Sequence, residues 1–339
     1  EGVSPRPFVL AQVGCGYWGP NLLRSFHAVP GARVKWLCDK LPGRLAWAKE
    51  RYPDLLTTTE LNDVLRDPEV DAVVIATEVV THHAIAKAAL KAGKHVFVEK
   101  PLARSVREAI DLAELAVSQN LVVLVGHVYL YNPAIRALLS ALTPRRLGRP
   151  LYLDLARVNP GPPAPRHSVI WDLAPHEASL AVVLAGSRPV SVRATGMRWG
   201  MKVFEAAFIE VAFQNGARAR IHASWRGHAR VRRLDAYCEK GAAYFDEMAE
   251  EKLRFVYPGR DNRGGAKAGS AVTLTYGAPR VEVPRLPAVE PLLAECADFI
   301  ASARRRREPV SGVALGTAVV RVLAAAELSA ASGGKEVLL

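Results

Sequence analysis

Three side chains in this sequence have types and positions suited to acid–base chemistry on a bound small molecule: Lys100, Asp172 and His176. Lys100 follows the apolar run 95–98 and precedes Pro101, which keeps the lysine out of the helical region and makes a cis bond accessible. Lysine at such a bend is suited to contact a ligand. The alternative is a surface lysine in a tight turn.

Asp172 and His176 lie at the expected start of a helix, near Ala174, because Pro175 is tolerated only in a first helical turn. One turn separates the two side chains, so they can converge on one site. The positive end of the helix dipole disfavours imidazolium, which suits His176 to accept a proton. The alternative is an aspartate cap beside a core histidine.

A glycine-rich hexapeptide connects the apolar run 8–13 to a helical pattern over 21–28. Glycines at this spacing permit a tight turn and close backbone approach, so that amides at the helix start face a pyrophosphate. The pattern therefore predicts dinucleotide binding. The predicted contacts are Gly14, Gly16, Tyr17, Trp18 and Gly19.

Asp39 ends the next apolar run, 33–38, and is twenty residues beyond Gly19. A carboxylate at that strand tip accepts hydrogen bonds from a ribose 2′-hydroxyl and repels a 2′-phosphate, which favours NAD over NADP. Lys40 and Arg44 are close enough in sequence to meet a phosphate, with surface charge as the alternative role.

Apolar runs alternate with helical patterns as far as residue 125, which is typical of a doubly wound parallel sheet. We therefore predict an α/β protein with a Rossmann domain over residues 1–125. Ligands bind at the carboxyl ends of parallel strands, where Thr77, His82 and Glu99 complete the predicted cofactor contacts.

Residues 126–339 have a different pattern, with strand-like runs at 150–158, 190–199, 203–214, 217–225 and 231–239 joined by turn signals. They predict an α+β domain on a mostly antiparallel open sheet. Helical patterns over 290–306 and 313–332 end the chain, and we allow for their packing back on the first domain.

Composition predicts a globular cytoplasmic protein: 339 residues, 50% hydrophobic and 23% charged, with no basic and apolar leader pattern. No apolar run approaches the ~20 residues of a membrane span. The four cysteines form no CxxC pair and no three histidines have metal-ligand spacing, so we expect neither a disulfide nor a metal. The net charge is +12, but the basic residues are not interleaved with aromatics as on a nucleic-acid surface, so the charge suits anionic small molecules. The basic run 304–307 is expected to be a solvated helix end.

The chain resembles the glucose-fructose oxidoreductase / inositol dehydrogenase (Gfo/Idh/MocA) family along essentially its full length. The residues that carry the resemblance are the hexapeptide 14–19, the segments 81–103 and 126–135, and Asp172 to His176. The resemblance implies that Lys100, Asp172 and His176 line the nicotinamide site and that the Lys100–Pro101 bond is cis. Where the family commonly has aspartate after the histidine, this chain has Glu177.

Segments 151–162 and 168–176 are similar to those of nucleotide-sugar dehydrogenases, which oxidise the 3-hydroxyl of substrates like UDP-N-acetylglucosamine. The resemblance implies substrate contacts at Tyr129, Arg157, Asn159, Arg166 and His167, with the basic residues near the two phosphates. The resemblance also implies that residues 126–339 form the substrate-binding and oligomerisation domain, so a homodimer or homotetramer is expected. Alternatives are a ketosugar reductase, an inositol or free-sugar dehydrogenase, an NAD-dependent glycosidase and a non-catalytic NAD sensor.

Overall fold

The computed structural model describes residues 6–161, 167–259 and 277–339. The chain divides into two compact units. The first unit consists of Glu1–Asn132 and Ala288–Ala325, and the second of Pro133–Pro287 and Ala326–Leu339. Each unit is built around its own sheet.

The first unit contains a six-stranded parallel sheet in the order β3-β2-β1-β4-β5-β6, which confirms the predicted Rossmann domain. Its strands are β1 (Phe8–Val13), β2 (Ala32–Cys38), β3 (Leu56–Thr58), β4 (Ala72–Ile75), β5 (His95–Glu99) and β6 (Val123–Gly126). Strand β1 and strand β4 are buried along their whole lengths, as expected for the centre of a sheet covered on both faces.

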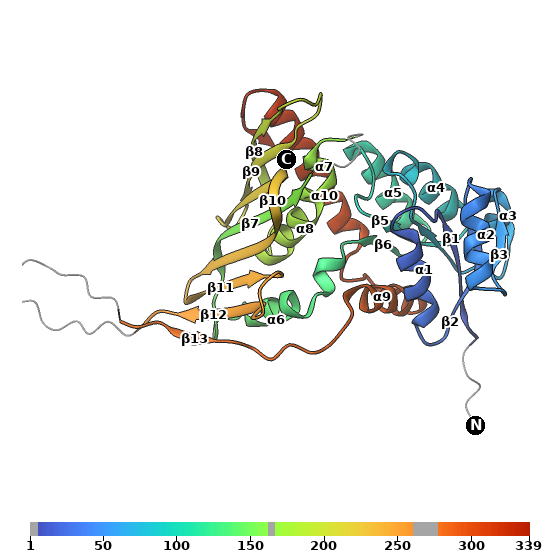
Figure 1. Cartoon of the computed structure of the whole chain (residues 1–339), viewed down its shortest axis with the longest axis horizontal. Helices are drawn as coiled ribbons and strands as arrows, with labels where there is room; N and C mark the ends of the chain where they lie inside the picture. Colours follow the sequence, from blue (N-terminus) through green and yellow to red (C-terminus); the bar gives the residue numbers. More distant parts are fainter. Residues whose placement is uncertain (1–5, 162–166, 260–276) are drawn as a thin grey trace, which may run out of the picture. The chain divides into compact units, whose positions relative to one another are not determined.

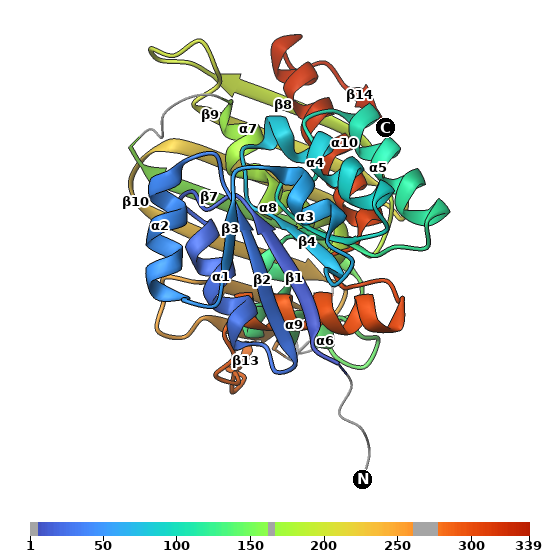
Figure 2. The same ribbon diagram turned by 90° about the vertical axis from the view of Figure 1, so that its right-hand side faces the viewer.

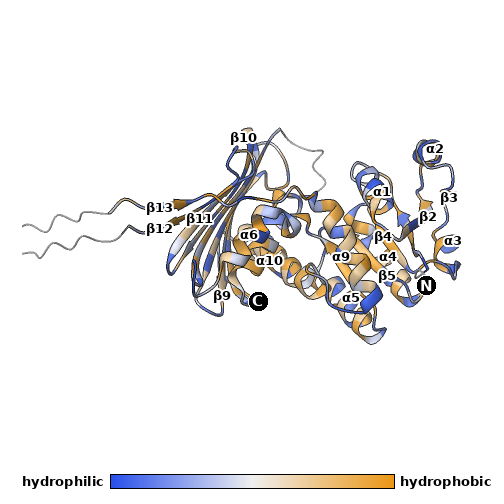
Figure 3. Cartoon of the chain, turned by 90° about the horizontal axis from the view of Figure 1, so that it is seen from below, coloured by the Kyte–Doolittle hydropathy of each residue, from blue (hydrophilic) through white to orange (hydrophobic). Residues whose placement is uncertain are grey.

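Helices α1 (Gly19–Ala28), α2 (Pro42–Arg51), α3 (Leu61–Arg66), α4 (Val79–Lys91) and α5 (Val106–Ser118) connect these strands. One helix layer contains α1 and the other contains α4 and α5, with the sheet between them (Figures 1 and 2). Figure 3 shows the apolar colouring concentrated in β4, β5 and the helices beside them. Burial of the sheet between its helix layers fixes the strand ends where the candidate site lies.

Helix α9 (Pro291–Arg305) belongs to the first unit and packs against α1. Phe299 of α9 forms edge-to-face contacts with Phe26 of α1 and Phe97 of β5, at centroid distances of 6.2 and 5.7 Å. The basic run 304–307 lies at the C-terminal end of α9, where Arg304 donates to Arg6 O and Gly31 O. All four arginines of the run are exposed, as expected for a solvated helix end, and Arg304 in addition contacts the backbone of the first unit.

The second unit contains an antiparallel sheet, as predicted, in the order β13-β12-β11-β10-β9-β8-β14. Its strands are β7 (Pro150–Pro160), β8 (Pro189–Met197), β9 (Ala206–Phe213), β10 (Arg218–Cys238), β11 (Gly241–Asp246), β12 (Leu253–Tyr257), β13 (Arg280–Glu282) and β14 (Val337–Leu338). The runs 217–225 and 231–239 are the two halves of β10. Strand β7 pairs with both halves, so that Leu155 is opposite Ile221 and also Leu234.

The remaining helices are η1 (Val128–Tyr131), α6 (Pro133–Ala141), α7 (Val169–Asp172), α8 (Ala174–Ala185) and α10 (Val313–Ala331). Helix α10 has 19 residues and a mean hydropathy of 1.6, so by length and composition it could cross a membrane. Half of the most apolar stretch of this helix is buried within the protein, as in a core helix. The sequence-based statement that no segment approaches this length was therefore wrong.

Candidate active site

The carboxyl ends of four parallel strands in the first unit carry the predicted cofactor residues. Strand β1 leads into Gly14, β2 into Asp39, β4 into Thr77, and β5 ends at Glu99. Parallel strands end at one edge of a sheet, so these residues share that edge. The arrangement is that of a dinucleotide site at the sheet's topological switch point.

The glycine loop is too tight for side chains at Gly14 and Gly19. A Cβ at Gly14 would lie 2.6 Å from Ala76 O, and the residue has a φ of +93°. A Cβ at Gly19 would lie 2.8 Å from Gly14 O. The buried Gln12 amide supports the turn by donating to Gly14 O and Gly19 O, each at 2.9 Å. Helix α1 then begins at Gly19, so its N-terminal amides face the loop, as a pyrophosphate requires.

Asp39 is buried and organises the ribose end of the site. Its Oδ2 accepts from Cys15 N at 2.7 Å and from the Arg44 guanidinium at 3.3 Å, while Oδ1 accepts from Leu41 N at 2.9 Å. The Arg44 guanidinium also lies 3.8 to 4.0 Å from the Cβ position of Gly16. The loop, helix start and carboxylate together fit NAD, which would supply a hydride acceptor when bound.

His82 connects the loop after β4 to the loop after β5. Its Nδ1 lies 2.9 Å from Pro101 O and its Nε2 lies 3.2 Å from Thr77 O. Burial lowers the pKa of His82, and a neutral ring can donate to only one of these carbonyls. Both nitrogens therefore face backbone rather than a ligand. Thr77 accepts at Oγ1 from Thr81 at 2.7 Å.

Lys100 follows β5 directly, and the Lys100–Pro101 bond is cis, which confirms the expectation from the family resemblance. The Lys100 amide donates to Glu99 Oε2 at 3.2 Å. The Glu99 carboxyl lies against Gly126, whose Cβ position is 3.1 Å from its oxygens. Burial raises the pKa of Glu99 to about 7, opposed by Lys100 and the Trp18 indole.

Asp172 and His176 lie in the second unit, at the junction of α7 and α8. Asp172 is the last residue of α7, and α8 begins at Ala174, as predicted, with Pro175 in its first turn. Asp172 Oδ2 accepts from the indole of the buried Trp225 on β10 at 3.0 Å. This bond fixes the carboxylate. His176 is half-buried in the first turn of α8.

A buried ion pair adjoins His176. Glu177 Oε1 accepts from Arg157 Nε at 2.6 Å, and both side chains are about 5% exposed or less. Burial raises the pKa of Glu177, and Arg157 opposes that rise. The Arg157 guanidinium therefore holds helix α8 to strand β7, which argues against its predicted role as a phosphate ligand.

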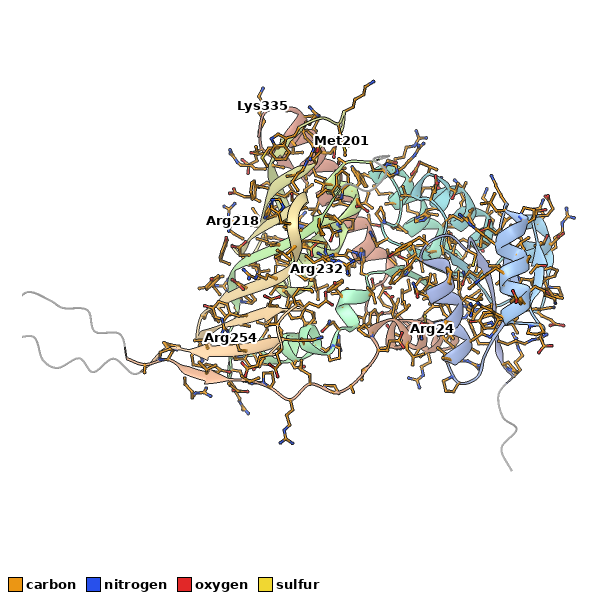
Figure 4. The ribbon with its side chains drawn as sticks, viewed as in Figure 1. Arg24, Met201, Arg218, Arg232, Arg254 and Lys335 are labelled. Carbon is orange, nitrogen blue, oxygen red and sulfur yellow. The ribbon has the colours of Figure 1, made fainter. Side chains whose placement is uncertain are left out.

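The other predicted substrate residues are dispersed. Asn159 Oδ1 accepts from Arg232 at 2.6 Å, and Figure 4 labels Arg232 on β10. Tyr129 is half-buried in η1 of the first unit, while His167 is exposed in the second. Arg166 lies outside the described residues. In the cofactor set, Tyr17, Trp18 and Lys40 are exposed, Tyr17 at 94%.

Sequence reasoning missed the support around these groups. It assigned no function to Trp225, Arg232 or Glu295, because the residues with which they interact are distant in sequence. The one available signal was a single glutamate, Glu295, within the apolar pattern of a helix. Among the residues that the structure describes, no three His, Cys, Asp or Glu side chains are grouped to hold a metal ion.

Comparisons with known proteins show the family of the chain. Residues 8–127 match the oxidoreductase family with an NAD-binding Rossmann fold, and residues 135–244 match the GFO/IDH/MocA C-terminal domain. The chain is 33% identical over 232 residues to UDP-N-acetylglucosamine 3-dehydrogenase of Acidithiobacillus ferrooxidans, covering 68% of this chain and 73% of that one. It is 29% identical over 230 residues to scyllo-inositol 2-dehydrogenase (NAD(+)) of Bacillus subtilis, covering 63% and 67%.

Solved structures give the same result for the fold. The structure of the Acidithiobacillus enzyme, GnnA, superposes with a TM-score of 0.83 at 25% identity, covering 96% of this chain and 97% of that one. GenD2 from gentamicin A biosynthesis, solved in complex with NAD, has a TM-score of 0.82 at 22% identity, covering 100% and 99%.

Proposed function

Because the chain belongs to the GFO/IDH/MocA family of oxidoreductases, we propose that it transfers a hydride between a sugar hydroxyl carbon and NAD. The sugar is a UDP-N-acetylhexosamine or a related nucleotide sugar, oxidised at C3. The observation that carries this proposal is Lys100 at the same sheet edge as the glycine loop, in a chain 33% identical to a UDP-N-acetylglucosamine 3-dehydrogenase.

The glycine loop and Asp39 would hold NAD, which would supply the hydride-accepting nicotinamide. The chain's own residues manage the hydroxyl. His176 accepts the hydroxyl proton as general base, and Lys100 donates a hydrogen bond to the oxygen as negative charge develops on it. Asp172, anchored by Trp225 at 3.0 Å, positions the sugar hydroxyl. The proposal requires Lys100 and His176 to reach the same hydroxyl in the enzyme–substrate complex.

Recognition of a nucleotide diphosphate calls for hydrogen-bond donors that a ligand can reach from solvent. Arg157 is buried and donates to Glu177 at 2.6 Å, so we assign this role to the half-buried Arg232 and the exposed His167 in its place. Arg232 already orients Asn159 at 2.6 Å, so the two act together. We further propose a cytoplasmic homodimer or homotetramer.

The test is incubation of the full chain and NAD with UDP-N-acetylglucosamine, free N-acetylglucosamine or scyllo-inositol, following NADH absorbance. The proposal expects NADH only with the UDP-sugar. Turnover of scyllo-inositol alone would support the inositol dehydrogenase alternative, which the Bacillus relative favours. Substrate loss without net NADH would indicate a glycosidase, and NAD binding without turnover of any compound would indicate a sensor.

A further inference from the structure

Three ionisable side chains in the first unit gather near Lys100, and the proposed reaction does not use them. They are Glu99 at the end of β5, His127 directly after β6, and Glu295 in α9. His127 and Glu295 are 0% exposed. Neither ring nitrogen of His127 and neither carboxyl oxygen of Glu295 has a hydrogen-bond partner among the described residues. Buried polar groups of this kind call for an explanation.

The two glutamates are electrically coupled. Glu99 acts on Glu295 and raises its pKa further after burial, which is the larger cause. Two carboxylates in such surroundings cannot both stay ionised, because each disfavours the other's charge and burial disfavours both. The pair therefore holds at least one proton in the neutral range.

The surroundings decide which carboxyl holds that proton. Glu99 has a donor in the Lys100 amide at 3.2 Å, and the Lys100 ammonium and the Trp18 indole also favour its ionised form. Glu295 faces only acidic influences, from Glu99 on β5 and Asp298 on its own helix.

The other groups around Glu295 do not change this assignment. Tyr131 of η1 donates to Asp298 Oδ2 at 2.9 Å, and the buried Cys296 thiol has its pKa raised, first by burial and then by Glu295. Arg24 of α1 is paired with Glu290. Burial and then Lys100 lower the pKa of His127 to about 3, so its ring is neutral.

We propose that Glu295 is a neutral carboxylic acid and a positioning residue, whose O–H donates toward Glu99 through ordered water and keeps Glu99 as the carboxylate beside Lys100. A paired carboxylate holds Lys100 as an ammonium. Lys100 is then a hydrogen-bond donor to the reacting oxygen, and the base is His176. The inference rests on the proposed function only in that Lys100 acts on the substrate.

The proton assignment can be tested without substrate. We would record infrared spectra of the full chain in mildly alkaline buffer and measure the C=O stretching band of protonated carboxyl groups. The wild type should show such a band, and Glu295→Gln should lack it. Glu290→Gln is the control and should keep the band, because Glu290, at the start of the same helix as Glu295, is exposed and paired with Arg24. A wild type without the band, or a band unchanged in Glu295→Gln, would overturn the proposal.

The effect on Lys100 can be tested with the pH profile of kcat/KM. If Glu295 is neutral, Glu295→Gln removes no charge. The fall of kcat/KM on the acid side of the profile should then occur at the same pH as in the wild type. If Glu295 were ionised, its removal would lower the pKa of Glu99 and move this fall to lower pH, which contradicts the proposal. Inactivity of every variant and of the wild type would contradict the proposed function alone, since the infrared result does not depend on turnover.

Discussion

Arg44 contacts one carboxylate oxygen of Asp39 at the ribose end of the cofactor site. A lone aspartate there excludes a 2′-phosphate, but Arg44 lies 3.3 Å from Asp39 Oδ2 and partly neutralises it. Because an arginine can also accommodate a 2′-phosphate, this pair weakens discrimination against NADP. The cofactor preference is therefore a balance between two side chains rather than a property of Asp39 alone.

Arg44→Ala should leave NAD binding nearly unchanged and weaken NADP binding by about tenfold, equivalent to about 1.4 kcal/mol. The dissociation constants of both nucleotides can be measured by titration calorimetry. Arg66→Ala, at an exposed position on α3, is the matched control for loss of a cation. Equal weakening of both nucleotides would mean that Arg44 contacts their common part.

Lys100→Met should lower kcat by about 10² to 10⁴-fold with the UDP-sugar, because the oxygen loses its donor as charge develops. NAD affinity should stay within a few-fold, since the glycine loop is untouched. Turnover and NADH release give the first quantity and calorimetry the second. Lys91→Met, at the exposed end of α4, should behave as the wild type. Full activity in Lys100→Met would remove Lys100 from the mechanism.

Gly14 in the glycine loop and Gly43 in helix α2 differ in why the chain has glycine there. Gly14 has a φ of +93° and no room for a Cβ, whereas Gly43 in α2 has nothing within 4 Å of its Cβ position. The first glycine is needed for the turn, and the second merely weakens a helix. This contrast supplies a matched pair of substitutions.

Gly14→Ala should abolish NAD binding and lower the midpoint of thermal unfolding, because Ala76 O would have to move. Gly43→Ala should raise stability by roughly 0.5–1 kcal/mol and leave binding intact. Thermal unfolding with and without NAD measures both effects. Retained NAD binding in Gly14→Ala would show that the loop can open without loss of the site.

The Arg157–Glu177 pair joins β7 to α8 in the second unit. Removal of one partner leaves a buried charge, so Arg157→Met should lower the free energy of unfolding by about 3–5 kcal/mol. Arg220→Met breaks an exposed pair with Asp154 and should change it by at most about 1 kcal/mol. Urea unfolding measures both, and equal small effects would contradict a structural role for Arg157.

The stability of the whole molecule should fall in acid, partly through His95. Burial, assisted by Arg306, lowers the pKa of His95 to about 4 from 6.5, and its Nδ1 accepts from Val122 N at 2.9 Å. The unfolded chain binds this proton first, so stability falls as the pH drops below 6.5 and levels off below about 4.

This group contributes about 3 kcal/mol between those limits, at ~1.4 kcal/mol for each pH unit. His95→Asn, which keeps an acceptor for Val122, should therefore flatten the pH dependence of the free energy of unfolding. The exposed His228→Asn is the matched control. Urea unfolding at a series of pH values tests this, and identical curves for His95→Asn and the wild type would exclude His95 as a cause.

Much of the first unit was predictable from the sequence. Phe8–Val13, Ala32–Cys38, Ala72–Ile75 and His95–Glu99 are short, largely apolar runs that are closely followed by glycine, aspartate, threonine or lysine, and each is a strand of the sheet. The same runs identified the glycine loop, Asp39 and Lys100 as strand-end residues. Local patterns carry this information because βαβ units repeat over short distances in the chain.

Other features depend on residues far apart in sequence and were decided only by tertiary structure. Strand β10 folds round β7, so that Tyr152 is opposite both Arg218 and Tyr237, and no local pattern specifies such pairing. The burial of Glu295 near Glu99 and the commitment of Arg157 to Glu177 likewise come from elements brought together by folding. The sequence by itself determined the chemical groups and the strand ends that carry them, because these depend on neighbouring residues. Folding decided which groups are buried, paired or protonated, because these depend on non-local contacts.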